Sequence, residues 1–241
     1  MPNTQLIETT EKFRQFVEKY DEAVKINNIK HEKKFKYLIS KNPNYGYMIA
    51  KGYIDLGSVN KPLITGTYRV NDDCSIDIEG DFRLTNIFDY NRKPLFLVED
   101  FPFKINKVSG NFEIAFIDIK NLDMFPRLVE GNVSLYNFRT SIEGIAGSVI
   151  KGDCIIACEP IELYFPDSVG GNLSIIDYNV DQTLHLDKTV YVGGCLTFLR
   201  MHITDPNVPK IKEKIIAKEY KFDERKLEKP KSKKKSKGVS K

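Results

Sequence analysis

The side chains of this sequence that could do chemistry are few and far apart. Cys154 and Cys158 form a C-x3-C pair, and two thiolates at that spacing could begin a tetrahedral zinc site. No second close pair of Cys or His follows, so we interpret Cys154 as a small buried hydrophobic residue. The other candidate bases, His31, His185 and His202, are widely separated, and the sequence contains no G-x-x-x-x-G-K-[ST] loop and no G-x-S-x-G elbow. We therefore expect no metal, no cofactor and no catalytic activity.

Residues 229–241 concentrate positive charge at the C-terminus. They read KPKSKKKSKGVSK, with seven Lys and no acidic residue. Because the whole chain has a net charge of +4, residues 1–228 have a net charge of −3. Such a tail can tether a polyanion such as nucleic acid, with an affinity that falls steeply with salt. It can equally be a solvated, disordered end that aids solubility, and both alternatives stay open. The candidate polyanion-binding residues are Lys231, Lys233, Lys234, Lys235 and Lys237.

The elements that would position functional side chains follow from a short sequence motif that occurs six times in the chain. We call this motif the phrase. Each copy has a β-branched residue, any residue, Gly, usually Asn or Asp, and then alternating apolar residues. The glycines stand at 80, 110, 131, 152, 171 and 194, mostly about 21 residues apart. Positions −2, +2 and +4 from each Gly are apolar and share one strand face, so each copy predicts one short strand with a buried face. A unit this short has no room for a βαβ crossover and is the size of one solenoid coil.

The Gly and the Asn or Asp of the phrase need separate explanations. Glycine lacks Cβ and allows a bulge or a positive φ where the chain enters the strand. The Asn or Asp beside it can hydrogen-bond neighbouring backbone or the equivalent residue of the next coil. We interpret these side chains as a ladder that seals the turn, in preference to a ligand site. They are Asp81, Asn111, Asn132, Asp153 and Asn172.

The flanking segments predict caps for the two ends of the array. Helical periodicity covers residues 9–26 and about 30–41, a hairpin is expected over 63–80, and a helix is expected from Pro209 to about 224. The expected organisation is a helical region (1–56), a hairpin plus solenoid (57–204), a capping helix (205–228) and a disordered Lys-rich tail (229–241). The predicted fold class is therefore a mainly β, leucine-rich-repeat-like solenoid with helical caps. No membrane-length apolar run or signal peptide is present, which favours a soluble cytoplasmic protein.

Residues 74–200 resemble a repeat family that is common in the genomes of large tailed bacteriophages. The family's strand-rich leader corresponds to CSIDIEGDFRL at 74–84, and its entry segment to FPFKINKVSGNFEI at 101–114. The family's return segment is matched only loosely, by FRTSIEGIAGSV at 138–149. The resemblance implies a phage-like origin, a host-cell cytoplasmic location and a leucine-rich-repeat-like fold. It implies no catalytic residues.

The positions of each strand that point outward are where a solenoid presents a binding surface. In the later copies these positions become more apolar, and an apolar run on an exposed face often marks a partner site. A cap or the curvature of the array could also cover the same residues. We expect a non-catalytic repeat protein that binds a macromolecular partner, with a host protein as the expected partner. The alternatives are a nucleic-acid-associated protein that uses its lysine tail and a virion or assembly component. The partner-binding candidates are Tyr136, Ile155, Ile176 and Leu199.

Overall fold

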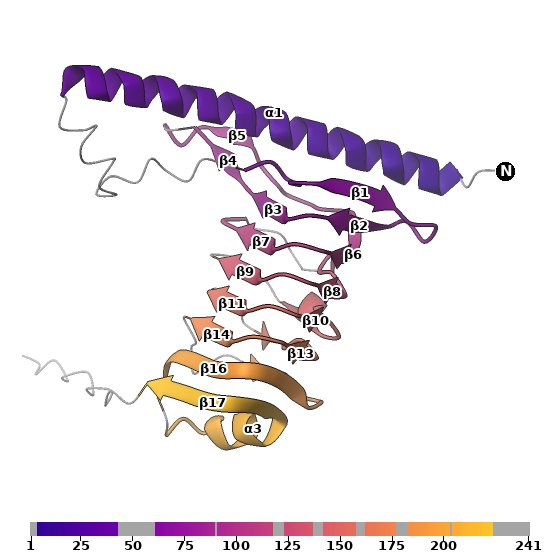
Figure 1. The fold of residues 1–241 in the computed structure, drawn as a ribbon, viewed down its shortest axis with the longest axis vertical. Coiled ribbons are helices and arrows are strands. Elements are labelled where there is room, and N and C mark those ends of the chain that lie inside the picture. The colour runs from indigo at the N-terminus through magenta and orange to yellow at the C-terminus, as the bar shows by residue number, and fades with distance from the viewer. Residues whose placement is uncertain are drawn as a thin grey trace, which may run out of the picture.

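The chain forms a β-solenoid with a long helix lying across its first end (Figure 1). This computed structural model describes residues 4–42, 61–89, 91–117, 123–136, 142–157, 162–176, 183–202 and 204–223. The solenoid makes about four turns, and its successive parallel strands lie about 22 residues apart. The predicted β-solenoid with a helix near each end is confirmed at this level.

Each of the first five copies of the phrase contributes two strands, because the chain bends at the Gly-Asx pair. The strands before the bend are β2 (Ser75–Glu79), β6 (Lys104–Val108), β8 (Leu128–Val129), β10 (Val149–Ile150) and β13 (Ser168–Val169). Those after it are β3 (Phe82–Thr85), β7 (Phe112–Ala115), β9 (Val133–Tyr136), β11 (Cys154–Ala157) and β14 (Leu173–Ile176). Each set forms a parallel ladder, and β16 (Val190–His202) runs through both and joins them in one 13-stranded sheet. The prediction of a single strand per copy is therefore wrong for these five copies.

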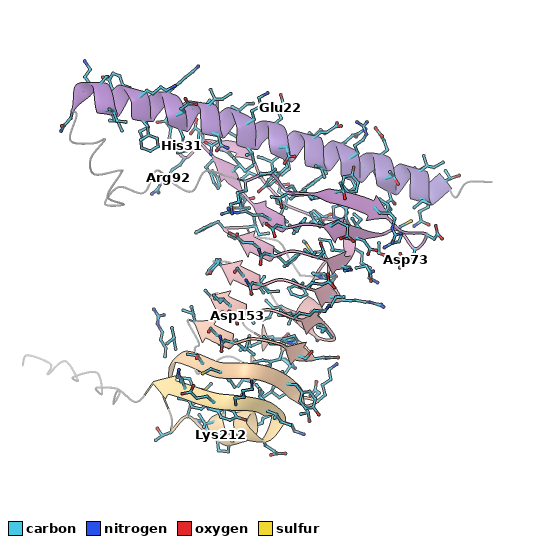
Figure 2. All side chains as sticks on the ribbon, viewed as in Figure 1. Glu22, His31, Asp73, Arg92, Asp153 and Lys212 are labelled. Atoms are coloured by element: carbon cyan, nitrogen blue, oxygen red, sulfur yellow. The ribbon has the colours of Figure 1, made fainter. Side chains whose placement is uncertain are left out.

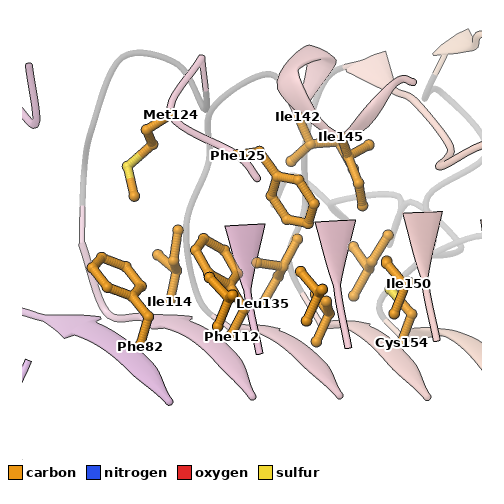
Figure 3. Packing of buried hydrophobic residues seen from close by; sticks show 14 of the residues in the cluster. Phe82, Phe112, Ile114, Met124, Phe125, Leu135, Ile142, Ile145, Ile150 and Cys154 are labelled. Carbon is orange, nitrogen blue, oxygen red and sulfur yellow. The ribbon is translucent and has the colours of Figure 1, made fainter. Parts of the chain in front are cut away.

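The fixed apolar positions of the phrase point into the solenoid. At −2, +2 and +4 from the six glycines, each side chain is at most 4% exposed. Figure 3 shows Phe82, Phe112 and Cys154 on the strand side of this core, with Met124 and Phe125 facing them from the return side. The rings of Phe82 and Phe112 stack with their centroids 5.2 Å apart. Cys154 is fully buried, which confirms its interpretation as a small hydrophobic residue; Cys158 lies outside the described residues.

The return side of the coils holds little regular structure among the described residues. A single 3-10 turn, η1, covers Glu143–Ile145, and β12 (Glu162–Leu163) pairs in parallel with β15 (Thr183–Leu184). The core is closed on this side by buried apolar residues from successive coils. They include Phe125, Ile142, Ile145, Leu163, Phe165 and Leu184.

The repeated glycines are required by the close approach of neighbouring coils. The N–H of each later repeat glycine donates to the carbonyl oxygen of the glycine one coil earlier, at 2.8–3.1 Å. A Cβ on Gly152 would lie 2.6 Å from the carbonyl oxygen of Gly131 and 2.4 Å from Oδ1 of Asn132. Of the six, only Gly80 has a φ in the left-handed region, at 134°. The lack of space for a Cβ between neighbouring coils therefore explains the glycines. A positive φ is a further reason only at Gly80, in the first copy.

The Asn and Asp side chains form the ladder that the sequence predicted. Oδ1 of Asp81 accepts the N–H of Asn111 at 2.7 Å, and the same contact repeats from coil to coil until Oδ1 of Asn172 accepts the N–H of Cys195 at 2.9 Å. Thr65 precedes the first copy, and its Oγ1 accepts the N–H of Asp81 at 3.1 Å. The ladder therefore begins at a threonine outside the repeat and ends at a cysteine.

The first end of the solenoid is covered by one continuous helix, α1 (Thr4–Lys41). The sequence predicted two helices, over 9–26 and about 30–41; this is wrong because the residues between them contain no Pro or Gly that would interrupt a helix. Phe13, Tyr20 and Val24 are buried on the side that faces the solenoid. Oδ1 of Asp21 accepts the N–H of Leu63 at 2.8 Å, which ties the helix to the start of the sheet region.

The first turn is longer than the others because it carries a small hairpin that supports α1. This hairpin pairs β4 (Ile87–Phe88) with β5 (Pro94–Phe96), whereas β1 (Thr67–Val70) pairs antiparallel with β2 at the edge of the main sheet. The ring of Phe96 packs edge-on against those of Phe16 and Tyr20, each with centroids 5.4 Å apart. Gly80 and Gly110 are 30 residues apart because the segment between them includes this hairpin, which holds α1 in place.

The other end is closed by a short helix and a strand. Helix α3 covers Val208–Lys214, and Ile215–Asp223 forms β17, which pairs in parallel with β16. The predicted helix from 209 to about 224 is therefore wrong beyond Lys214. The edge of β16 offers a full row of backbone partners, and pairing with it also lets β17 bury Ile215 against the core. Lys218 alone stands between Ala217 and Glu219, where β16 has Gly193 and Gly194, so β17 is one residue shorter at the bend and has no glycine there.

We expect Gly152→Ala to destabilise the solenoid more than Gly147→Ala. The first change places a Cβ against the preceding coil, and such overpacking costs about 1–3 kcal/mol. Gly147 has open space but a φ of 87°, so alanine there meets backbone strain alone, on the order of 1 kcal/mol. Urea unfolding followed by circular dichroism measures both. Equal losses of unfolding free energy would show that close approach between coils is not the constraint.

Candidate functional site

The outer face of the sheet carries the residues that differ from copy to copy. Because the core residues occupy positions −2, +2 and +4, the side chains at −3 and at +3 and +5 stand on the opposite face. Figure 2 shows Asp153 in the middle of the stacked strands and Lys212 at the end opposite α1. The outer face therefore runs between two covered ends, and its two edges lie before and after the glycine bend.

The predicted partner-binding residues all lie on the edge of the outer face that follows the glycine bend. We call them the downstream group: Tyr136, Ile155, Ile176 and Leu199. Tyr136, Ile155 and Ile176 are half-buried, and Leu199 is 47% exposed. Ala157 pairs with both Tyr136 and Ile176 and separates them, and Ile155 has a serine as its partner on each neighbouring strand. The four residues share one face, but small and polar side chains interrupt their apolar surface.

A second set of apolar residues, before the bend, was missed by the sequence reasoning. We call Leu128, Val149, Tyr191 and Ile216 the upstream row. Val149 pairs with Leu128 and Ser168, Ser168 pairs with Tyr191, and Tyr191 pairs with Ile216. Val149 is 39% exposed, Tyr191 56% and Ile216 52%. The signal was available at position −3 of each copy, but only positions after the glycine were considered, and Ile216 was assigned to a helix.

Backbone is exposed beside the upstream row where the last copies have a second glycine. Gly170 and Gly193 occupy position −1, next to the repeat glycines. A Cβ on Gly193 would lie 2.1 Å from the carbonyl oxygen of Gly170, and one on Gly170 would lie 2.2 Å from that of Lys151. Between Tyr191 and the bend, β16 therefore has no side chain on the outer face. This combination of an exposed aromatic ring and bare backbone can accept a bulky apolar group.

The upstream row and the downstream group lie at opposite edges of the face. Tyr191 and Leu199 are eight residues apart on β16, up to roughly 26 Å if the strand were straight. A single small ligand cannot reach both, but a protein surface of ordinary size can. The arrangement is that of an extended surface.

Charged side chains border the upstream row toward α1. Glu130 lies between Lys151, at 2.8 Å, and Lys107, at 3.5 Å. The hydrogen bond from Lys151 is the main cause that holds the pKa of Glu130 below its ordinary value. Nearer α1, Arg83 pairs with Glu113 at 3.1 Å beside a polar hollow of about 210 Å³. The outer face is therefore polar and charged near α1 and apolar near β17.

The two histidines whose side chains the structure describes, His31 and His185, lie on different parts of the molecule. His31 stacks on Phe35 in α1, and His185 stacks on Tyr164 at 4.1 Å on the return side, 3.8 Å from Oε1 of Glu162. The side chain of His202 lies outside the described residues, as do Lys231, Lys233, Lys234, Lys235 and Lys237. Among the described residues, no three His, Cys, Asp or Glu side chains are grouped so that they could hold a metal, and no helix is long and apolar enough to cross a membrane.

We expect Lys151→Ala to raise the pKa of Glu130 toward its ordinary value of 4.5. The change removes the hydrogen bond that lowers this pKa most, while Lys107 remains. Because folding lowers the pKa, the contact favours the folded state above about pH 4.5 and is lost as the pH falls through the lowered value. A pH titration of the Glu130 carboxyl by ¹³C NMR measures the shift. The control is Lys188→Ala, which removes a different ion pair, with Asp167 at 2.5 Å; a similar shift in the control would contradict the assignment.

Comparisons of this chain with protein-family models, with curated proteins and with solved structures give no match. Its description as a β-solenoid therefore rests on its own strand pairing and repeat spacing.

Proposed function

We propose that this chain is a non-catalytic binding protein that holds a partner protein against the outer face of its last coils. The observation that carries the proposal is the exposure of Tyr191 and Ile216 as direct neighbours on β16 and β17. Tyrosine is enriched among the few side chains that contribute most of the binding energy in protein interfaces. Val149 and Leu128 lie in the same row beyond Ser168, so the proposed contact covers several strands.

The chemistry around the row defines the kind of partner. Lys107 and Lys151 stand on the side toward α1 and Lys218 on the last strand, against Glu130 and Glu219. The surroundings of the row thus carry more positive than negative charge. The matching partner surface is an apolar patch with an acidic border, because complementary rim charges speed association and fix orientation. The downstream group adds a second contact zone at the far edge.

The origin of the protein enters the same proposal. The phrase V-x-G-[ND]-apolar resembles the leucine-rich-repeat-like solenoids of large tailed bacteriophages, and the regular coils described above support the solenoid part of that resemblance. A phage protein of this kind works in the cytoplasm of the infected bacterium, where a host protein is the available partner. The proposed partner is accordingly a bacterial host protein.

The test begins with a photo-crosslinking amino acid in place of Tyr191 in the full chain. Crosslinking in a bacterial lysate, followed by a high-salt wash and mass spectrometry, identifies a candidate partner, which is then purified. We expect Tyr191→Ser combined with Ile216→Ser to weaken its binding by at least roughly tenfold, since central interface side chains commonly contribute this much. Isothermal titration calorimetry measures the dissociation constant.

The matched control is Leu97→Ser combined with Phe116→Ser, because these side chains are as exposed but lie outside both apolar sets. Equal weakening by the control and the test variant would overturn the proposal. A further variant, Ile155→Ser with Ile176→Ser, reports whether the downstream group takes part. If no protein is crosslinked at Tyr191 and nucleic acid alone is recovered from the lysate, the row is not a protein-binding surface.

A second candidate function is nucleic-acid association through the lysine tail. It is favoured by the seven lysines, without an acid, in residues 229–241. We expect deletion of 229–241 to leave the partner protein bound and to reduce salt-sensitive retention of nucleic acid, as measured by absorbance after affinity capture at 50 and 200 mM KCl. Loss of the partner protein on this deletion would move recognition from the solenoid to the tail.

A further inference from the structure

Helix α1 continues well beyond the part of it that is buried. Its last buried residue is Asn27, and the helix runs 14 residues further, to Lys41. This overhang, residues 28–41, is roughly 21 Å long at the usual rise of an α-helix. Figure 1 shows the C-terminal part of α1 passing beyond the β4–β5 hairpin. Burial against the described core therefore does not account for the length of the helix.

The overhang and the turn before it carry a strong positive charge. Residues 24–41 contain six lysines and one acidic residue, Glu32, for a net charge of +5. Residues 4–23 of the same helix contain five acidic and three basic residues, for a net charge of −2. The negative charge of residues 1–228 as a whole conceals this contrast. The body of the protein thus has its own basic surface, separate from the lysine tail.

Stabilisation of the helix accounts for only part of this charge. Lysines favour the C-terminal end of a helix through its dipole, but the effect is confined to the last turn, where only Lys41 stands. Glu32 pairs with Lys36, and Asp89 lies 3.8 Å from Lys30. These two ion pairs involve Lys30 and Lys36. The net charge of +5 on residues 24–41 already includes Glu32, so positive charge remains available to a ligand.

The lysines are arranged along one side of the overhang. Lys30, Lys34, Tyr37 and Lys41 follow each other at three- and four-residue steps, which places them on one stripe of a helix. Lys33 is next to this stripe. A hollow of about 480 Å³ is lined by Lys30, Lys33, Lys34, Tyr37 and Leu38. The stripe rises roughly 16 Å along the helix axis, which corresponds to about five phosphates of one strand of a duplex.

The chemistry of this stripe fits a phosphate backbone. Lysine is a flexible point charge that contacts phosphate without the fixed geometry that arginine uses to read a base. A membrane surface fits less well, because an interfacial helix separates its apolar face from its charged face. Here the exposed Ile29 lies between Lys33 and Lys36 around the helix, and the exposed Tyr37 lies between Lys30 and Lys33.

We propose that the overhang of α1 binds the phosphate backbone of nucleic acid, with Lys33, Lys34 and Lys41 as the main contacts. The surface lies at the end of the solenoid opposite β17 (Figure 1), so it operates independently of the apolar row around Tyr191. Contacts of this kind are not sequence-specific, and their affinity depends on the number of phosphates neutralised.

The test measures binding of the full chain to a fluorescent 30-base-pair DNA duplex and to a 30-nucleotide single strand, by anisotropy over 50–200 mM KCl. We expect the triple variant Lys33→Gln, Lys34→Gln and Lys41→Gln to bind the duplex at least about tenfold more weakly at 100 mM KCl, and the slope of log affinity against log salt to become shallower by up to about 2.7, at about 0.9 per phosphate contact. Glutamine keeps the length and helix propensity of lysine, and circular dichroism checks the helix. A stronger effect on the single strand than on the duplex would identify single-stranded nucleic acid as the ligand.

The control variant removes the same charge elsewhere, through Lys12→Gln, Lys19→Gln and Lys218→Gln, all at exposed positions. Both variants are also measured in a chain ending at Glu228, so that the tail does not mask the helix. Equal losses in the test and control variants, or an unchanged salt slope in both chain lengths, would overturn the proposal. So would tight binding to vesicles of one part phosphatidylserine and three parts phosphatidylcholine without binding to either DNA.

Discussion

The rest of the fold depends on how closely successive coils approach each other at the glycine bend. There, the N–H of one glycine donates to the carbonyl oxygen of the glycine before it, and a Cβ would lie within about 2.6 Å of neighbouring atoms. The Asx ladder beside it fixes the next backbone N–H. These two rows satisfy backbone N–H groups at the bend between the two strands of a coil. The strands on both sides keep their register because the bend between them is held in place.

This constraint divides the phrase into residues that must repeat and residues that are free to change. The apolar residues at −2, +2 and +4 fill the core, while the Gly and the Asx hold the bend. The outward positions meet neither requirement, so they can be polar near Arg83 and Glu113 and apolar near Tyr191. The binding surfaces proposed above occupy these free positions and the overhang of α1, where no packing requirement selects the side chain.

Periodicity in the sequence was sufficient to predict the solenoid, the buried face and the Asx ladder, because each depends on a regular pattern. It was insufficient where tertiary contacts decide the outcome. The stretch around Ile215 has apolar residues that suit a helix, yet the open edge of β16 offers backbone hydrogen bonds that make it a strand. The join between 9–26 and 30–41 likewise carries no signal that ends a helix. The upstream row escaped prediction because the bend places part of each strand before the glycine.

The bend region of β17 lacks both the Gly and the Asx that the first five copies share. Within the repeat, each coil offers the next one a glycine carbonyl oxygen at close range and an Asx side chain that accepts a backbone N–H. In β17, Ala217, Lys218 and Glu219 stand where a repeating coil would have the residues of the bend. β17 therefore pairs with β16 without a Gly or an Asx of its own at the bend. A further coil stacked on β17 would thus lack the Asx side chain that, in each of the first five copies, accepts a backbone N–H of the next coil.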